Sequence, residues 1–131
     1  VGPGAFFGGL SAIHQFVHIG AGAMIGGGAM VAQDVVPFGL AQGDRAKIVG
    51  LNVVGLRRRG LSREGLAALK SAYRHLFQEG LGLAEAIAKI EQQQRSPELD
   101  IFLSFLRGTS SRGLCRPAAK SDGAETAETL A

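Results

Sequence analysis

The feature that most constrains this chain is a six-residue repeat that runs through residues 1–36. The first residue of every hexad is apolar, the second is Gly or Ala except at His14, and the fifth is small or β-branched. A period of six fits neither an amphipathic helix nor an alternating strand, but it is typical of a parallel β-helix whose flat faces meet at tight corners. We expect the six apolar first positions to point into the coil, namely Val1, Phe7, Ile13, Ile19, Ile25 and Val31.

The repeat is short for an architecture of this kind. If three hexads make one triangular turn, residues 1–36 supply two turns, whereas solenoids usually need about three or more repeats to bury a core. The repeat is already under way at Val1, so we expect the chain to be the C-terminal portion of a longer protein. Pro37-Phe38-Gly39 breaks the period, and Ile48-Val49 and Val53-Val54 predict short strands on the last coil.

The second half of the chain predicts three helices. Ser62 and Ser96 are suitable N-cap residues, Pro97 occupies a first helical position, and Gly80 and Gly108 end two of the helices. The apolar faces comprise Leu66, Leu69, Tyr73, Leu76 and Phe77, then Leu83, Ile87 and Ile90, then Leu99, Phe102, Leu103 and Leu106. The predicted architecture is a β-solenoid with a transition segment over residues 1–60, a small helical domain over 61–116 and a disordered tail over 117–131.

Composition narrows the class of protein. The single cysteine, Cys115, excludes a disulfide framework, and neither a signal peptide nor a membrane span is recognisable, so we expect a cytoplasmic protein without membrane insertion. All 14 Lys and Arg residues follow position 44, and the densest cluster is Arg57-Arg58-Arg59. Such a cluster is either a solvated surface or a site for an anionic partner. Because the chain has one Tyr and no Trp, we do not expect nucleic acid to be that partner.

Several ordered segments carry a resemblance to a known family. They are Gly8-Gly9-Leu10-Ser11-Ala12-Ile13-His14-Gln15-Phe16, Ile25-Gly26-Gly27, Val31-Ala32-Gln33-Asp34-Val35, Ala41-Gln42-Gly43, Gly50-Leu51-Asn52, Gly55-Leu56-Arg57-Arg58-Arg59-Gly60 and Ser110-Ser111-Arg112-Gly113-Leu114. Together they resemble the bacterial UDP-N-acetylglucosamine O-acyltransferases, the first enzymes of lipid A biosynthesis, over residues 1 to about 116. The resemblance implies a left-handed parallel β-helix and a homotrimer with active sites in the clefts between subunits. It also implies transfer of a 3-hydroxyacyl chain from acyl carrier protein to the 3-hydroxyl of the sugar in UDP-N-acetylglucosamine.

The resemblance assigns substrate-binding roles, but no catalytic residue, to this chain, since the family's catalytic histidine lies upstream of the matched residues. It makes His14 and Gln15 substrate-binding groups, although a lone histidine in a repeat is more often a packing or surface residue. It makes Asn52 a contact of the uridine nucleotide. Arginine suits bidentate contact with phosphate, so we assign Arg58 to the diphosphate of the substrate and Arg59 to its support or to the carrier protein.

Other residues are expected to form the acyl groove and the docking surface. The resemblance places Met24 and Gly27 along the acyl chain, where a glycine leaves room that a side chain would close. Val54 departs from the glutamate that is frequent in the family, which puts one nucleotide contact in doubt. Because acyl carrier proteins are acidic, Arg57, Lys70 and Arg74 form a plausible docking surface, the alternative being a solvated helix face. No cofactor is expected beyond the phosphopantetheine of the carrier protein.

Two alternatives stay open at this point. Hexapeptide coils also carry zinc in the γ-class carbonic anhydrases, but the repeat holds only His14 and His18, so we expect no metal and give His18 a structural or exposed place. The chain contains binding elements without a convincing general base. It is therefore either the C-terminal portion of an O-acyltransferase or a non-catalytic module for trimerisation and carrier docking.

Overall fold

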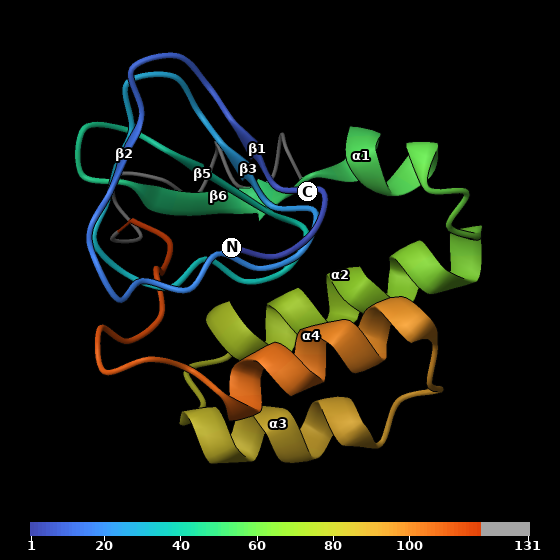
Figure 1. Cartoon of the computed structure of the whole chain (residues 1–131). Coiled ribbons are helices and arrows are strands. Elements are labelled where there is room, and N and C mark those ends of the chain that lie inside the picture. Colours follow the sequence, from blue (N-terminus) through green and yellow to red (C-terminus); the bar gives the residue numbers. More distant parts are fainter. Residues whose placement is uncertain (119–131) are drawn as a thin grey trace.

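A computed structural model describes residues 1–118 of the chain and comprises short strands followed by helices (Figure 1). Most of the expected tail, residues 119–131, lies outside the described residues. The elements are β1 (Phe6–Phe7), β2 (Ala12–Ile13), β3 (Met24–Ile25), β4 (Met30–Val31), β5 (Gly39–Gln42), β6 (Lys47–Leu51), α1 (Val53–Arg58), α2 (Arg63–Phe77), α3 (Leu83–Glu91) and α4 (Pro97–Arg107).

Residues 1–42 form stacked turns of chain. Phe6 pairs with Met24 and Ala12 pairs with Met30, both in parallel and both with an offset of 18 residues. A third contact between turns joins the Gly2 amide to the Ile19 carbonyl over 2.7 Å. Each turn therefore contacts its neighbour at three places, which agrees with three hexads for each turn. The partial sheets that result have the strand orders β1-β3-β5-β6 and β2-β4.

The last stacked turn is two residues shorter than the one before it. Met24 pairs with Leu40 and Ile19 with Val35, an offset of 16 residues in place of 18. The residues are lost between Val31 and Val35, which lie next to Ile13 and Ile19 of the preceding turn. The period that breaks in the sequence at Pro37 is thus already shortened at the preceding corner.

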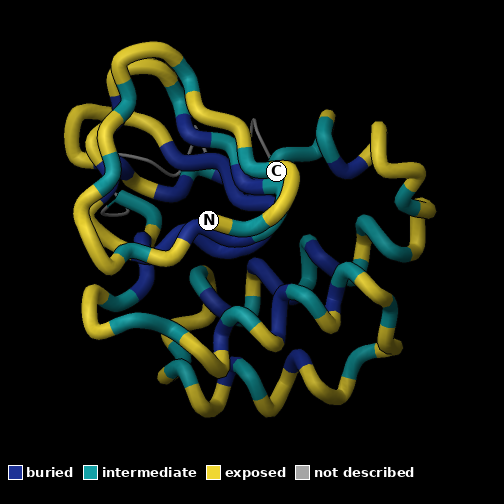
Figure 2. The backbone as a smooth tube through the Cα atoms, in the orientation of Figure 1, coloured by how far each residue is buried: buried dark blue, intermediate teal, exposed yellow. Residues whose placement is uncertain are grey.

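The apolar first positions of the hexads divide by turn. Ile19, Ile25 and Val31 are buried as expected, and Ile13 is partly buried. Val1 and Phe7 are 82% and 36% exposed, although Phe7 pairs in parallel register with buried Ile25 and so lies on the same face of its strand. They lie on the first turn, which has a neighbouring turn on one side only. Figure 2 shows the same gradient, from a mostly exposed first turn to buried strands in the later turns.

The second half of the transition segment differs from the prediction. Ile48-Val49 lies in a strand, but β6 runs antiparallel to β5 instead of continuing the parallel stack. Val53-Val54 begins helix α1 and is not a strand. The reason is local, because the Asn52 side-chain oxygen accepts the Gly55 amide over 3.1 Å and caps the helix at that point.

The three predicted helices are confirmed as α2, α3 and α4. Ser62 accepts the Gly65 amide at the start of α2, and Ser96 accepts the Leu99 amide at the start of α4. Figure 1 shows α2 and α4 on the side of the stacked turns and α3 farther from them. The apolar faces and the stacked turns share one buried core. In residues 1–118, no helix is long and apolar enough to cross a membrane.

The segment after α4 returns to the stacked turns. Asp34 and Leu114 form a parallel bridge, and the Ile48 amide donates to the Arg116 carbonyl over 3.1 Å. The carboxylate of Asp34 is fully buried and accepts the His18 amide (2.9 Å), the Ser110 amide (2.5 Å) and the Ser110 hydroxyl (2.6 Å). Asp34 thereby fastens residues 110–116 to the turns that lie some 76 residues earlier in the sequence.

Candidate functional site

His14 and Gln15 lie at an exposed corner of the second half of the first turn. The His14 amide donates to the Val31 carbonyl over 2.9 Å, so the backbone at this corner is fixed while both side chains face outward. The next turn is shorter beneath this corner, and the corner therefore protrudes. His18, at the end of the same segment, is exposed and lies edge-on to Phe105 of α4 with the ring centres 6.5 Å apart, consistent with the structural or exposed place expected for it.

Met24 and Gly27 lie on β3 and on the corner that follows it. Met24 is partly buried between its strand partners Phe6 and Leu40, while Gly27 is exposed. A Cβ placed on Gly27 would lie 3.2 Å from the carbonyl oxygen of Gly9 on the neighbouring turn, which is a tight contact. The glycine thus avoids a tight contact at a corner where the turns approach closely.

Asn52 joins α1 to the stacked turns. Its side-chain oxygen caps α1, and its side-chain nitrogen donates to the Gly22 carbonyl over 3.3 Å. Its backbone amide donates to the Phe38 carbonyl over 2.6 Å. A Cβ on Gly55 would lie 2.5 Å from Asn52 Nδ2, so a larger residue at this position would displace the capping side chain. Both polar atoms of the Asn52 side chain already form a hydrogen bond within the protein. A contact with a nucleotide would have to use the second N–H of Nδ2 or the second lone pair of Oδ1.

The three arginines of the basic cluster have different surroundings. Arg57 and Arg58 are exposed in the last turn of α1 and form no ion pair with any residue that the structure describes. Arg59 caps the C-terminus of α1, where its guanidinium carbon lies 5.2 Å from the centre of the Phe38 ring and its Nη2 lies 3.6 Å from Glu98 Oε2. Among the described residues, Arg59 is therefore engaged within the protein, while its two neighbours have no ion-pair partner.

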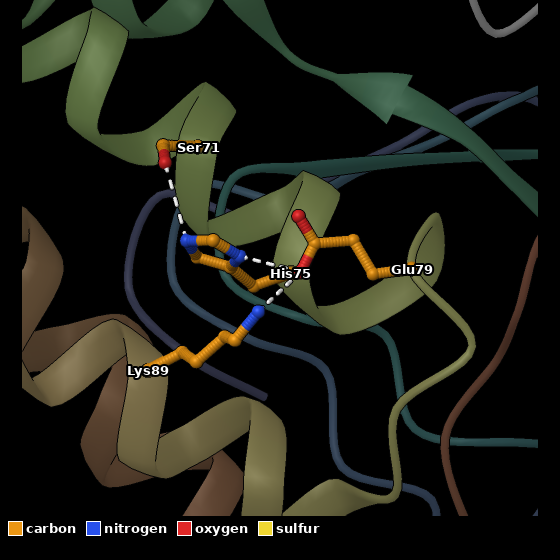
Figure 3. Close-up of polar contacts among 4 residues, drawn as sticks. All are labelled: Ser71, His75, Glu79 and Lys89. Atoms are coloured by element: carbon orange, nitrogen blue, oxygen red, sulfur yellow. Dashed lines mark hydrogen bonds and ion pairs between the residues drawn. The ribbon is translucent and has the colours of Figure 1, made fainter.

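Lys70 and Arg74 lie one turn apart on α2, beside a polar cluster that the sequence analysis did not single out (Figure 3). His75 Nδ1 lies 2.7 Å from Glu79 Oε1, and Lys89 Nζ of α3 lies 3.5 Å from the same oxygen. The hydrogen bond from His75 is the main reason that the pKa of Glu79 lies below its ordinary value. Ser71 Oγ lies 3.5 Å from His75 Nε2 within α2. The contact of Lys89 with Glu79 connects this cluster to α3.

The predicted binding residues occupy three different corners of the turn. His14 and Gln15 lie at the corner around Phe16, and Gly27 lies at the corner that Gly28 and Gly9 share. Asn52 and Arg59 contact the corner formed by Gly22 and Phe38, as described above. The strands between the corners keep these groups apart, and one copy of the chain does not bring them together.

Two further observations concern ligands. A groove of about 450 Å³ runs between the stacked turns and α4, lined by Gly2, Gly20, Ala21, Ile101 and Phe105 among others, and none of the predicted site residues lines it. In the described part of the chain, no group of three or more His, Cys, Asp or Glu side chains is arranged to hold a metal ion.

Two related sequences share one name. Acyl-[acyl-carrier-protein]–UDP-N-acetylglucosamine O-acyltransferase from Anaeromyxobacter sp. (strain K) is 47% identical over 111 residues, which are 84% of this chain and 43% of that protein. The protein of the same name from Nautilia profundicola is 52% identical over 107 residues, 82% of this chain and 41% of the relative. The chain thus spans less than half the length of the curated relatives that it matches.

Solved structures and a family profile give the same result. The UDP-N-acetylglucosamine acyltransferase of Bacteroides fragilis superposes with a TM-score of 0.79 at 35% identity, covering 84% of this chain and 43% of that one. The O-acyltransferase of Moraxella catarrhalis gives a TM-score of 0.83 at 35% identity, with 88% and 45% covered. The profile described as Udp N-acetylglucosamine O-acyltransferase, Domain 2, matches residues 34–115. The chain therefore belongs to the UDP-N-acetylglucosamine O-acyltransferase family.

Proposed function

We propose that the polypeptide containing this chain transfers a 3-hydroxyacyl chain from acyl carrier protein to the 3-hydroxyl of UDP-N-acetylglucosamine. The observation that carries the proposal is the family match over residues 34–115, together with relatives of that name at 47% and 52% identity. The proposal includes a left-handed β-helix, which extends the stacked parallel turns described here. The chain spans less than half the length of those relatives. The proposal therefore includes catalytic groups that lie outside this chain.

The placement of the binding residues supports a homotrimer. His14, Gly27 and Asn52 lie on different corners of one three-sided turn, so they cannot converge on a ligand within one copy of the chain. Side by side packing of three copies brings a corner of one copy against a different corner of the next. A cleft between copies can then combine His14 and Gln15 with Arg58 and Asn52 on one sugar nucleotide.

The chemistry of each group fits a role in binding. Arg58 supplies a fork of N–H donors for the diphosphate, and Arg59 supports it from the Phe38 corner. Met24 and Gly27 line the path of the acyl chain, while Arg57, Lys70 and Arg74 receive the acidic carrier protein. The proposal requires no cofactor beyond the phosphopantetheine that carries the acyl group.

The reaction needs one proton transfer and one acyl transfer. A histidine outside this chain takes the proton of the sugar 3-hydroxyl while the hydroxyl oxygen attacks the thioester carbonyl, and the phosphopantetheine thiolate leaves. The residues of this chain hold the nucleotide and the acyl chain, which fixes the distance between the two reacting atoms. Their contribution is therefore to binding and orientation.

A chimaera tests the proposal. Residues 1–116 of this chain replace the matching segment of the Anaeromyxobacter relative, and transfer from 3-hydroxyacyl carrier protein to UDP-N-acetylglucosamine is measured. We expect Arg58→Ala to weaken binding of the UDP-sugar about tenfold or more, since a hydrogen bond to a charged group contributes about 1.5–3 kcal/mol. Arg63→Ala, at the exposed start of α2, is the matched control and should change affinity little. Equal effects of the two substitutions would show that the basic segment acts as a diffuse field.

The same chimaera separates this function from a non-catalytic role. The second candidate is supported by one observation, that the residues described here offer binding groups on every corner while the expected base lies elsewhere. A chimaera that forms trimers and binds acyl carrier protein but transfers no acyl chain would favour a module for trimerisation and carrier docking. Turnover with the expected dependence on Arg58 would favour the enzyme.

A further inference from the structure

Helix α1 is too short to hold its own shape. It has six residues, whereas isolated helices below about 12–15 residues are marginal in water. Its position therefore depends on tertiary contacts, which are the packing of buried Leu56 in the core and the contacts at its two ends. At the N-terminal end, Asn52 bonds to Gly22 and to Phe38 through its side chain and its backbone amide, respectively.

The C-terminal end of α1 is held at the same corner by Arg59. The guanidinium carbon lies 5.2 Å from the centre of the Phe38 ring, a distance at which an arginine is attracted to an aromatic face. Arg59 Nη2 also lies 3.6 Å from Glu98 Oε2. The Glu98 side chain is 16% exposed and sits in the first turn of α4, where the helix dipole favours a carboxylate.

Arg57 and Arg58, which form no ion pair within residues 1–118, lie between these two attachments. Arg57 and Arg58 occupy the last turn of α1, directly before Arg59, and both are exposed. Any rotation of α1 about its axis would turn their guanidinium groups away from a ligand in a fixed position. The contact from Glu98 to Arg59 is also a direct polar connection from α4 to the basic segment.

We infer that Arg59 and Glu98 are positioning residues, which fix α1 against the Phe38 corner so that Arg58 faces the diphosphate. The role in ligand binding rests on the proposed function, while the role in ordering α1 does not. Glu98 acts through Arg59 and does not touch the ligand. Arg59 is engaged with Phe38 and Glu98, so Arg58 is the residue that binds the phosphate.

The first measurement follows amide hydrogen exchange in the complete 131-residue chain. Glu98→Gln should speed exchange at the Leu56 and Arg59 amides, which donate within α1, about two- to fivefold, because partly exposed ion pairs contribute about 0.2–1 kcal/mol. Glu91→Gln is the matched control, since it removes a different arginine ion pair, with Arg107, in the same helical layer. Unchanged exchange in Glu98→Gln, or an equal change in both variants, would overturn the inference.

The second measurement titrates UDP into the same variants by calorimetry. Glu98→Gln should raise Kd about two- to fivefold, Glu91→Gln should leave it unchanged, and Arg59→Gln with Glu98→Gln should bind no more weakly than Arg59→Gln alone. Binding that Glu98→Gln does not weaken would refute the positioning role and leave the proposed diphosphate contact intact. If the unaltered chain binds no UDP, the proposed contact in this chain fails, and the exchange measurement still decides whether Glu98 orders α1.

Discussion

At the scale of single residues, Asp34 is the one charged side chain that is buried in the part of the chain described here. Burial of a carboxylate is unfavourable unless hydrogen bonds satisfy it, and three donors from His18 and Ser110 do so. Two of these donors belong to the segment that follows α4. The charge therefore specifies where the end of the described chain attaches to the stacked turns.

We expect Asp34→Asn to lower the free energy of unfolding by about 2–3 kcal/mol. The amide keeps the shape of the side chain but turns an NH2 group towards donors, which leaves buried N–H or O–H groups without an acceptor. Urea denaturation measures the change. Asp44→Asn, at an exposed position of the β5–β6 turn, should stay within about 0.5 kcal/mol, and a similar loss in both variants would contradict the assignment.

Cys115 makes the stability of the fold depend on pH in the alkaline range. Desolvation by burial raises the pKa of its thiol from 9.0 to about 11, so the folded chain holds this proton where the unfolded chain releases it. This group should therefore lower the free energy of unfolding by about 2–3 kcal/mol between pH 9 and 11, and have no effect below pH 8. Burial also raises the pKa of Tyr73 from 10.0 to about 12, which adds a loss of the same sign between about pH 10 and 12.

Urea denaturation at several pH values measures this slope. Cys115→Ala should show a flatter decline between pH 9 and 11, whatever its effect on stability at pH 7. An identical slope in the two proteins would mean that another group causes the alkaline loss.

At the scale of elements, the starts of helices could be predicted from the sequence, because the capping interactions that determine them are local. The starts of α2 and α4 follow from Ser62 and Ser96, because a capping hydroxyl acts within three residues of itself. Helix α1 carries a comparable signal in Asn52 and Gly55, but the β-branched pair Val53-Val54 favours a strand and led to the wrong prediction. Capping outweighs strand propensity here, since Asn52 also bonds to Gly22 on the stacked turns.

Features that depend on contacts between distant segments were not predictable in the same way. The hexad period indicates stacking at 18 residues, yet the offset shortens to 16 at the corner that contains Asp34, where residues 113–115 bond to the chain from far along the sequence. The reversal of β6 and the attachment of Arg59 to Glu98 likewise involve no repeated pattern in the sequence. The distribution of the predicted site residues over three corners is also visible only in the structure.

The corner that holds Gly27 should set the length of the acyl chain. In the chimaera, Gly27→Met should shift preference towards shorter 3-hydroxyacyl donors, because the new side chain must project outward from a corner whose Cβ position lies 3.2 Å from Gly9. Competition between donors of several lengths measures the preference. Gly82→Met, at an open position before α3, is the control, and an unchanged preference in Gly27→Met would remove Gly27 from the groove.

At the scale of the whole molecule, the stacked turns and the helices share one core. Ile25 and Ile48 belong to the same buried cluster as Leu69, Phe102 and Leu114, so the expected boundary near Gly60 separates segments of sequence rather than independent cores. Residues 110–116 strengthen the connection by pairing with both Asp34 and Ile48. A variant that loosens the helical layer should therefore also reduce the stability of the stacked turns.

The 131-residue chain on its own should show no measurable acyl transfer. A positioned general base typically contributes about 10²–10⁴-fold to a rate, and correct placement of the reactants contributes more. The proposed base lies outside the chain, and the binding groups lie on separate corners. The assay uses 3-hydroxyacyl carrier protein and UDP-N-acetylglucosamine with the chimaera as positive control, and robust turnover by the isolated chain would contradict the proposal.

The two ends of the parallel stack differ in how they meet other strands. At one end, antiparallel β6 and the residues around Leu114 occupy the backbone groups of the last turn. At the other, β1 pairs on one side only and presents Phe6 and Phe7, 58% and 36% exposed. Under the proposed function the longer polypeptide adds further turns, and these can stack only on the β1 edge, because the opposite end is occupied. The β-helix therefore lengthens in one direction only, away from β6 and the segment around Leu114.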